Sequence, residues 1–211
     1  MRDVQEADKR SVMRTVPVGS LDTLLETLDL RRPAVAAHSR RVAMAARKLA
    51  MAVGLDVQEL ADLTTAALVH DAGSLLGRPT NLLDLEEWCG LSEDVSDILW
   101  YSSRPYGHHK HAPLTARILA VAHTFDDLIS PREYQVPMSP ETARLAIARE
   151  AGRRFCPLAA NALTMVQPEL VDQDADRAVA EVTPCGRADI DVSRLDAAAP
   201  WRIDYRLVTT S

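Results

Sequence analysis

The sequence predicts an all-α fold, a helical bundle followed by a small β-hairpin or strand extension at the C-terminal end. Apolar residues recur with the 3.6-residue period of amphipathic helices from about residue 20 to residue 166. The stretch 114–129 is apolar nearly all round, as expected of a helix at the centre of a bundle. Period-2 alternation, the pattern of a strand, is confined to the tail, at Asp189–Val192 and Trp201–Leu207.

The first two helices are bounded by residues that start and stop helices. Ser20 can cap a helix that continues to about Leu28. A second helix is expected from about Ala34 to Val53, and Gly54 is expected to end it as a C′ glycine.

The third helix begins after Asp56, because Asp56 and Glu59 have the spacing of a capping box. Its apolar face continues to His70–Asp71, and Gly73 is expected to break it. The histidine and aspartate are therefore predicted to end a buried face.

The remaining helices have start signals of their own. Ser92 can cap a short helix, Pro113 can open the central apolar helix, and Ser139–Pro140 can open another. A last helix covers roughly Leu158–Val166, and residues 104–111 are predicted to form a loop.

The length of 211 residues suits one domain with an extension. We expect an N-terminal arm at residues 1–17, a helical domain at 18–168 and a C-terminal extension at 169–211. The arm is expected to be loose, and the extension to contribute the strands.

Composition and charge exclude several classes of protein. The net charge of −6 argues against general binding of nucleic acid, and charged residues interrupt every apolar run before membrane length. The three cysteines are scattered and form no CxxC pair, which predicts a reducing compartment without structural disulfides. We therefore expect a soluble cytoplasmic protein with no nucleic-acid or membrane partner; a homodimer is compatible with the sequence.

Three histidines lie on predicted buried faces of three different helices: His38, His70 and His123, with Asp71 next to His70. A lone histidine in such a place is more often a satisfied core residue, but imidazole nitrogen and carboxylate oxygen are also metal ligands. Burying all four without a metal or a hydrogen-bond network would be costly. The set therefore predicts about one divalent transition metal per chain, iron, zinc, manganese or nickel.

Three segments around these residues have recognisable motifs. They are AHSRRV at residues 37–42, LVHDAG at 68–73 and AVAHTFDDLI at 120–129. Together they resemble the HD superfamily, and most closely an HD-GYP domain, over about residues 20–166. Similar matches follow at SPREY (130–134), SPETA (139–143) and FCP (155–157).

The sequence departs from the HD-GYP pattern at several positions. The family segment usually reads Ala-Asp-x-Phe-Asp-Ala-Leu, and His123 stands in place of its first aspartate. Ser74 replaces the lysine after His-Asp-x-Gly, and Tyr101–Ser103 replaces His-His-Glu. The additional histidine after the His-Asp pair and the Gly-Tyr-Pro signature have no counterpart.

The resemblance implies a metal-dependent phosphohydrolase that acts on a small phosphorylated or nucleotide substrate. HD-GYP domains with intact motifs hydrolyse cyclic di-GMP, and the lost ligands argue against that substrate here. Asp71 and Asp126 are the catalytic candidates. Asp126, one turn after His123, is expected to orient that histidine or to act as a base.

Four residues are candidates for binding the phosphate: Arg41, Arg104, His108 and His109. Arg41 lies in a basic segment, residues 31–48, that contains no acid and would suit an anionic ligand or a solvated face. For Arg41, pairing with an acid such as Asp126 is the more common arrangement. The histidine-rich segment at residues 108–111 forms either an exposed polar loop or the source of a replacement metal ligand or phosphate contact.

Two other functions are compatible with the same residues. The first is a catalytically inactive HD module that binds a nucleotide or a protein partner. The absence of the family's lysine and His-His-Glu motif suggests this hypothesis. The second is an iron oxygenase built on the HD scaffold. Metal content and turnover distinguish the three hypotheses.

Overall fold

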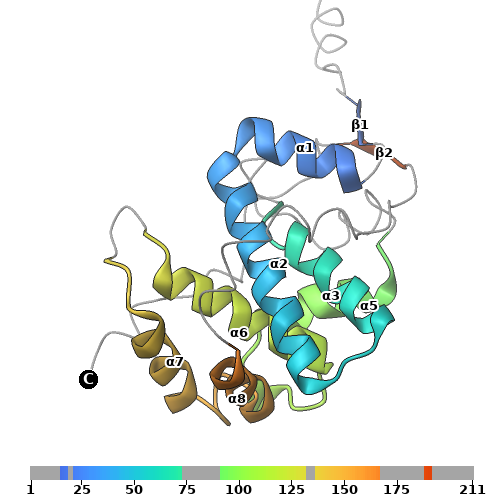
Figure 1. The fold of residues 1–211 in the computed structure, drawn as a ribbon. Helices are drawn as coiled ribbons and strands as arrows, with labels where there is room; N and C mark the ends of the chain where they lie inside the picture. The colour runs from blue at the N-terminus through green and yellow to red at the C-terminus, as the bar shows by residue number, and fades with distance from the viewer. Residues whose placement is uncertain (1–14, 19–20, 73–90, 132–135, 167–187, 192–211) are drawn as a thin grey trace, which may run out of the picture.

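The structure, a computed structural model, describes residues 15–18, 21–72, 91–131, 136–166 and 188–191. Within these residues seven α-helices form a bundle, which confirms the all-α prediction (Figure 1). The helices are α1 (Leu21–Arg31), α2 (Pro33–Val53), α3 (Val57–Val69), α5 (Glu93–Ser102), α6 (Leu114–Ile129), α7 (Pro140–Arg149) and α8 (Pro157–Met165). A 3-10 turn, η3 (Tyr106–His108), lies between α5 and α6.

Helices α2 and α3 form an antiparallel hairpin (Figure 1). Gly54 ends α2 in the left-handed conformation, with φ of 81°, and its N–H bonds to the carbonyls at the end of the helix. Asp56 and Glu59 then form the predicted capping box, each side chain accepting the other's backbone N–H at 2.9 Å. Both local predictions are confirmed, and together they fix the turn between the two helices.

Helix α6 is the central element of the bundle. Twelve of its sixteen residues are buried, and it contacts α2, α3, α5, α7 and α8. The nearly all-round apolar pattern predicted this position. Two aspartates, Asp126 and Asp127, are among its buried residues, which is unusual enough to need a specific explanation.

Small side chains let the central helices pack closely. Alanines fully buried on α2 and α6 are Ala43, Ala46, Ala50, Ala116 and Ala122. Larger apolar residues of the neighbouring helices, such as Leu63, Leu68 and Ile147, are buried in the same core. Among the described helices, none is both long and apolar enough to cross a membrane.

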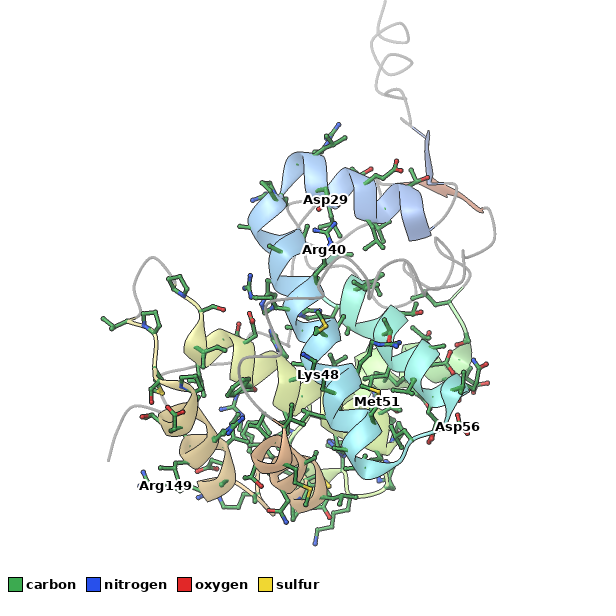
Figure 2. The ribbon with its side chains drawn as sticks, viewed as in Figure 1. Asp29, Arg40, Lys48, Met51, Asp56 and Arg149 are labelled. Carbon is green, nitrogen blue, oxygen red and sulfur yellow. The ribbon has the colours of Figure 1, made fainter. Side chains whose placement is uncertain are left out.

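Helix α1 is attached to the bundle by apolar packing and by one ion pair. Leu24 and Leu28 are buried in the core. Asp29 on α1 pairs with Arg40 on α2, and Figure 2 shows both side chains where the two helices meet. One basic residue of the segment 31–48 is therefore used in holding helices together.

The predicted caps of two later helices are also present. The Ser92 hydroxyl accepts the Val95 N–H at 3.2 Å, and the Ser139 hydroxyl accepts the Thr142 N–H at 3.2 Å. The expected cap at Ser20 and the breaking glycine at Gly73 lie outside the described residues.

A two-stranded antiparallel sheet joins β1 (Thr15–Val18) to β2 (Ala188–Asp191), with Thr15 opposite Asp191. The alternation at Asp189–Val192 correctly predicted a strand. Its partner differs from the prediction, because the strand pairs with residues expected to be a loose arm. Trp201–Leu207, the other predicted strand, lies outside the described residues.

Candidate metal centre

The α2–α3 hairpin places His38 beside His70. His38 precedes Gly54 by 16 residues and His70 follows it by 16 residues. Because helices rise about 1.5 Å per residue, equal distances from the turn bring the two residues to the same level of an antiparallel pair. Their Nε2 atoms lie 3.3 Å apart, and the His38 side chain is buried.

Hydrogen bonds fix which nitrogen of each ring carries the proton. His38 Nδ1 donates to the Asp126 carboxylate at 2.7 Å, and His70 Nδ1 donates to the Ala67 carbonyl at 2.7 Å. Both acceptors are oxygens without a proton, so Nδ1 is the protonated atom in both rings. In the neutral imidazoles, Nε2 is then a lone-pair acceptor.

A carboxylate oxygen faces the same two nitrogens. Asp71 Oδ2 lies 3.6 Å from His38 Nε2 and 3.7 Å from His70 Nε2. With both imidazoles neutral, none of these three atoms donates a hydrogen bond to the other two. Three acceptors that face one another at this distance suit a cation between them.

The spacing agrees with that of metal ligands. Ligands about 2.1 Å from a tetrahedral metal lie roughly 3.4 Å from one another. His123 on α6 completes the set, with its ring centroid 5.2 Å from that of His38 and 4.8 Å from that of His70. One ligand atom from each of the four residues lies within 4.8 Å of all the others, so His38, His70, Asp71 and His123 could hold one metal ion.

The environment of His70 favours the form that binds metal. Burial lowers the pKa of His70, and the charge of His38 adds to this, although Asp71 and the bond to Ala67 oppose it. The neutral imidazole, rather than the imidazolium, is therefore preferred, and only the neutral form can be a ligand.

Asp126 is the residue that orients His38. Its buried carboxylate also accepts hydrogen bonds from Arg41 Nε at 2.7 Å, Arg41 Nη2 at 2.9 Å and the Ser130 hydroxyl at 3.1 Å. Burial alone would raise the pKa of Asp126, but the bonds from His38 and Arg41 outweigh it and lower the pKa to about 2. Asp126 is thus a charged, fully hydrogen-bonded support for the site.

This arrangement differs from the sequence interpretation in two ways. Asp126 was expected to orient His123, but it orients His38 on another helix. Arg41 was a candidate phosphate contact; its guanidinium is bound to Asp126 and to Ser130 at 3.2 Å, which is the alternative pairing. Arg47, from the same basic segment, contacts the Thr64 hydroxyl at 3.4 Å.

Asp127 is the carboxylate beside His123. Its Oδ2 lies 3.4 Å from His123 Nε2, four residues earlier on α6, and the side chain is fully buried. Burial raises the pKa of Asp127 to about 7; the charges of Asp71 and Asp126 add to this, while those of His38 and Arg154 oppose it. The sequence interpretation assigned Asp127 no functional role, although the i,i+4 spacing was a usable signal.

The loop at residues 104–111 forms a separate cluster. The Tyr101 hydroxyl lies 3.3 Å from His111 Nε2, and the rings of His109 and Tyr101 are 6.1 Å apart. Arg104 stacks on the Trp100 ring, 3.5 Å from its centroid. The predicted residues Arg104, His108 and His109 are therefore not brought among the four ligand atoms, which form the only such group in the described residues.

A buried arginine that the sequence analysis did not identify holds this loop. Arg117, only 3% exposed, donates from its guanidinium to the carbonyls of Arg104, at 3.0 Å, and of His109. The Gly107 N–H bonds to the Arg153 carbonyl at 2.7 Å, and a Cβ at Gly107 would lie only 3.1 Å from that oxygen. The loop is thus fixed by backbone contacts on both sides.

Comparison with known proteins agrees with this geometry. Residues 35–150, more than half of the chain, match the HD domain family. The chain belongs to the HD domain family. The prediction from the sequence motifs is confirmed, and the His70–Asp71 pair at the centre of the site is the pair that names the family.

Two curated relatives of this HD domain come from Vibrio cholerae serotype O1. One, named 3'3'-cGAMP-specific phosphodiesterase 2, is 28% identical over 189 residues, covering 74% of this chain and 34% of its own. The other, named probable cyclic di-GMP phosphodiesterase, is 37% identical over 60 residues, covering 28% of this chain and 14% of its own. The HD domain chain thus spans about a third of the length of the first relative, and less of the second.

Proposed function

We propose that this HD domain is a metal-dependent phosphohydrolase that acts on a small phosphorylated or nucleotide substrate. One observation carries the proposal: His38 Nε2, His70 Nε2 and Asp71 Oδ2 face one another within 3.7 Å, while Nδ1 of each histidine bonds to an oxygen outside this group. The names of the two relatives, both phosphodiesterases, support the same class of reaction.

His38, His70, Asp71 and His123 would hold the metal. A divalent ion supplies charge to polarise a phosphoryl oxygen and lowers the pKa of water, so that a nucleophile forms near neutral pH. Asp126 and the Ala67 carbonyl keep the Nε2 atoms of His38 and His70 turned inward. Asp126 is a poor general base, because its pKa of about 2 favours the ionised, hydrogen-bonded form; we assign it to positioning. Asp71 is therefore the better candidate for contact with the reacting groups.

The loop residues Arg104, His108 and His109 would bind a remote part of the substrate. None of these side chains belongs to the group of ligand atoms. The carbonyls of Arg104 and His109 are held by Arg117, six residues before His123 on α6, which places the loop beside the site and not in it. We therefore assign the loop to a second phosphate or a base of an extended, nucleotide-sized substrate.

We further propose that cyclic di-GMP is turned over negligibly. Tyr101–Ser103 offers no imidazole or carboxylate in place of His-His-Glu, and Tyr101 contacts His111 in the surface loop. One route to phosphodiester cleavage uses two metal ions that stabilise the attacking and the leaving oxygen. Residues 101–103 provide no histidine or carboxylate ligand for a second ion. The missing ligands also favour a second candidate function, a catalytically inactive module that binds a nucleotide for regulation.

The test is hydrolysis by protein reconstituted separately with zinc, iron, manganese and nickel. The substrates are a chromogenic phosphodiester, 3'3'-cGAMP, cyclic di-GMP and linear nucleotides. We expect metal-dependent release of product from at least one substrate other than cyclic di-GMP. His70→Ala should lower kcat/KM by more than about 100-fold, and Arg149→Ala, on the exposed end of α7, should not.

Arg104→Ala and His109→Ala should raise KM more than they lower kcat, because they bind a part of the substrate that does not react. Metal-loaded protein that hydrolyses none of the substrates but binds a nucleotide would establish the regulatory module instead. Oxygen-dependent turnover with bound iron would identify an oxygenase. Rapid cleavage of cyclic di-GMP would contradict the proposed selectivity.

A further inference from the structure

The four ligand residues leave a divalent ion with an unbalanced charge. Three are neutral imidazoles, and Asp71 brings the one negative charge among them. Asp126, which supports His38, is negative as well, but Arg41 binds it through two nitrogens and offsets that charge. A second negative charge close to the site would make the metal centre neutral and lower the cost of burying the ion.

Asp127 is placed to supply that charge. It is fully buried on α6, one turn after His123, with Oδ2 3.4 Å from His123 Nε2. A cation bound by the four ligand atoms would stabilise the ionised form of this buried carboxylate, which is costly to bury otherwise.

We propose that Asp127 is the charge-balancing carboxylate of the metal centre, held against the ring of His123. It orients the His123 ring and offsets the second positive charge of a divalent ion. The proposal rests on the metal centre of the proposed function, but it requires neither substrate nor catalysis. Asp127 is a positioning residue in this assignment, and the metal affinity of the protein depends on its charge.

The competing explanation is that Asp127 is a structural partner of Arg154. Arg154 interacts electrostatically with Asp127, but also with Glu150, which is the stronger influence on the pKa of Arg154. If that ion pair were the purpose of Asp127, removing either partner would destabilise the fold and leave metal affinity unchanged. The two explanations therefore differ in what Asp127 variants do to metal affinity.

The experiment measures zinc affinity of the full chain by competition with a chromophoric chelator, and unfolding of each apoprotein by urea. Asp127→Asn keeps the size of the side chain and removes its charge. We expect zinc affinity to fall by about 10- to 100-fold, the usual range for a residue that supports a metal ligand. The apoprotein should be as stable as the parent or more stable, because a buried charge is lost. Arg154→Met, the matched control, should change zinc affinity by less than about threefold.

A second background tests whether the effect of Asp127 depends on the histidine at position 123. In His123→Asp, position 123 itself supplies the second carboxylate, so Asp127→Asn should then change zinc affinity by less than about threefold. A non-additive double-mutant cycle of this kind would support the proposal. An equal loss of affinity in both backgrounds, or no loss in the parent, would overturn it. Zinc binding with no effect of Asp127 would refute this inference alone, whereas absence of metal binding in every protein would refute the proposed function as well.

Discussion

The Nδ1 atom of His38 lies 2.7 Å from the Asp126 carboxylate, although the two residues are 88 positions apart in the sequence. This contact connects α2 to α6 and turns Nε2 of His38 toward His70 and Asp71. The bond thus couples the packing of the two helices to the geometry of the metal centre. Changes at either end should be visible in metal affinity as well as in stability.

Asp126→Asn tests this coupling. The amide keeps the shape of the side chain but weakens the bonds to His38 and to Arg41, so His38 loses its fixed orientation. We expect a loss of zinc affinity of about 10- to 100-fold and of unfolding free energy of about 1–3 kcal/mol. Chelator competition and urea unfolding measure the two effects. Ser130→Ala removes a single hydrogen bond to the same carboxylate and should change zinc affinity far less; equal effects of both variants would contradict the assignment.

His123 should control which metal is preferred. An imidazole at this position supplies nitrogen and no charge, whereas aspartate supplies a charged oxygen. His123→Ala should weaken zinc binding strongly, and His123→Asp should keep a site whose preference moves from zinc toward manganese. Competition between zinc and manganese, followed by elemental analysis, measures the change. The same affinity and selectivity in the parent and both variants would show that His123 is a core histidine only.

Metal removal should destabilise the protein. An ion that binds the folded state at 1,000 times its Kd stabilises it by about 4 kcal/mol. We expect purified protein to contain about one transition metal per chain, and chelation to lower Tm by several degrees, reversibly on adding metal back. Elemental analysis and thermal unfolding check this. No metal after reconstitution with zinc, iron, manganese and nickel would argue against the site.

Arg117→Met should loosen the 104–111 loop and leave the metal centre intact. The methionine keeps an apolar side chain in the core but cannot bond to the carbonyls of Arg104 and His109. Hydrogen exchange of the loop amides should become faster by about 10-fold, equivalent to roughly 1.4 kcal/mol of lost local stability. Zinc affinity should stay within about threefold of the parent. A large loss of zinc affinity would show that the loop contributes to the metal centre.

Local chemistry made much of the fold predictable. The capping box at Asp56 and Glu59, the caps at Ser92 and Ser139 and the left-handed Gly54 each depend on residues within a few positions of one another. The apolar periodicity of α6 depends on its own sixteen residues. Such signals are complete within a short stretch of sequence, so no knowledge of the tertiary packing was needed.

The sequence by itself determined which four residues the site would gather, because His38, His70, Asp71 and His123 lie on buried faces within family motifs. Only the tertiary structure decided which carboxylate supports which histidine. Asp126 and Asp127 follow His123 by three and four residues, and a helix places both spacings on the same face. The choice depends on the packing of α2 against α6, which brings His38 and Arg41 to Asp126 and leaves Asp127 beside His123. Contacts between residues 85 or more positions apart, and the pairing of β1 with β2, are set by how the helices and termini pack, and periodicity along one segment contains no information about that.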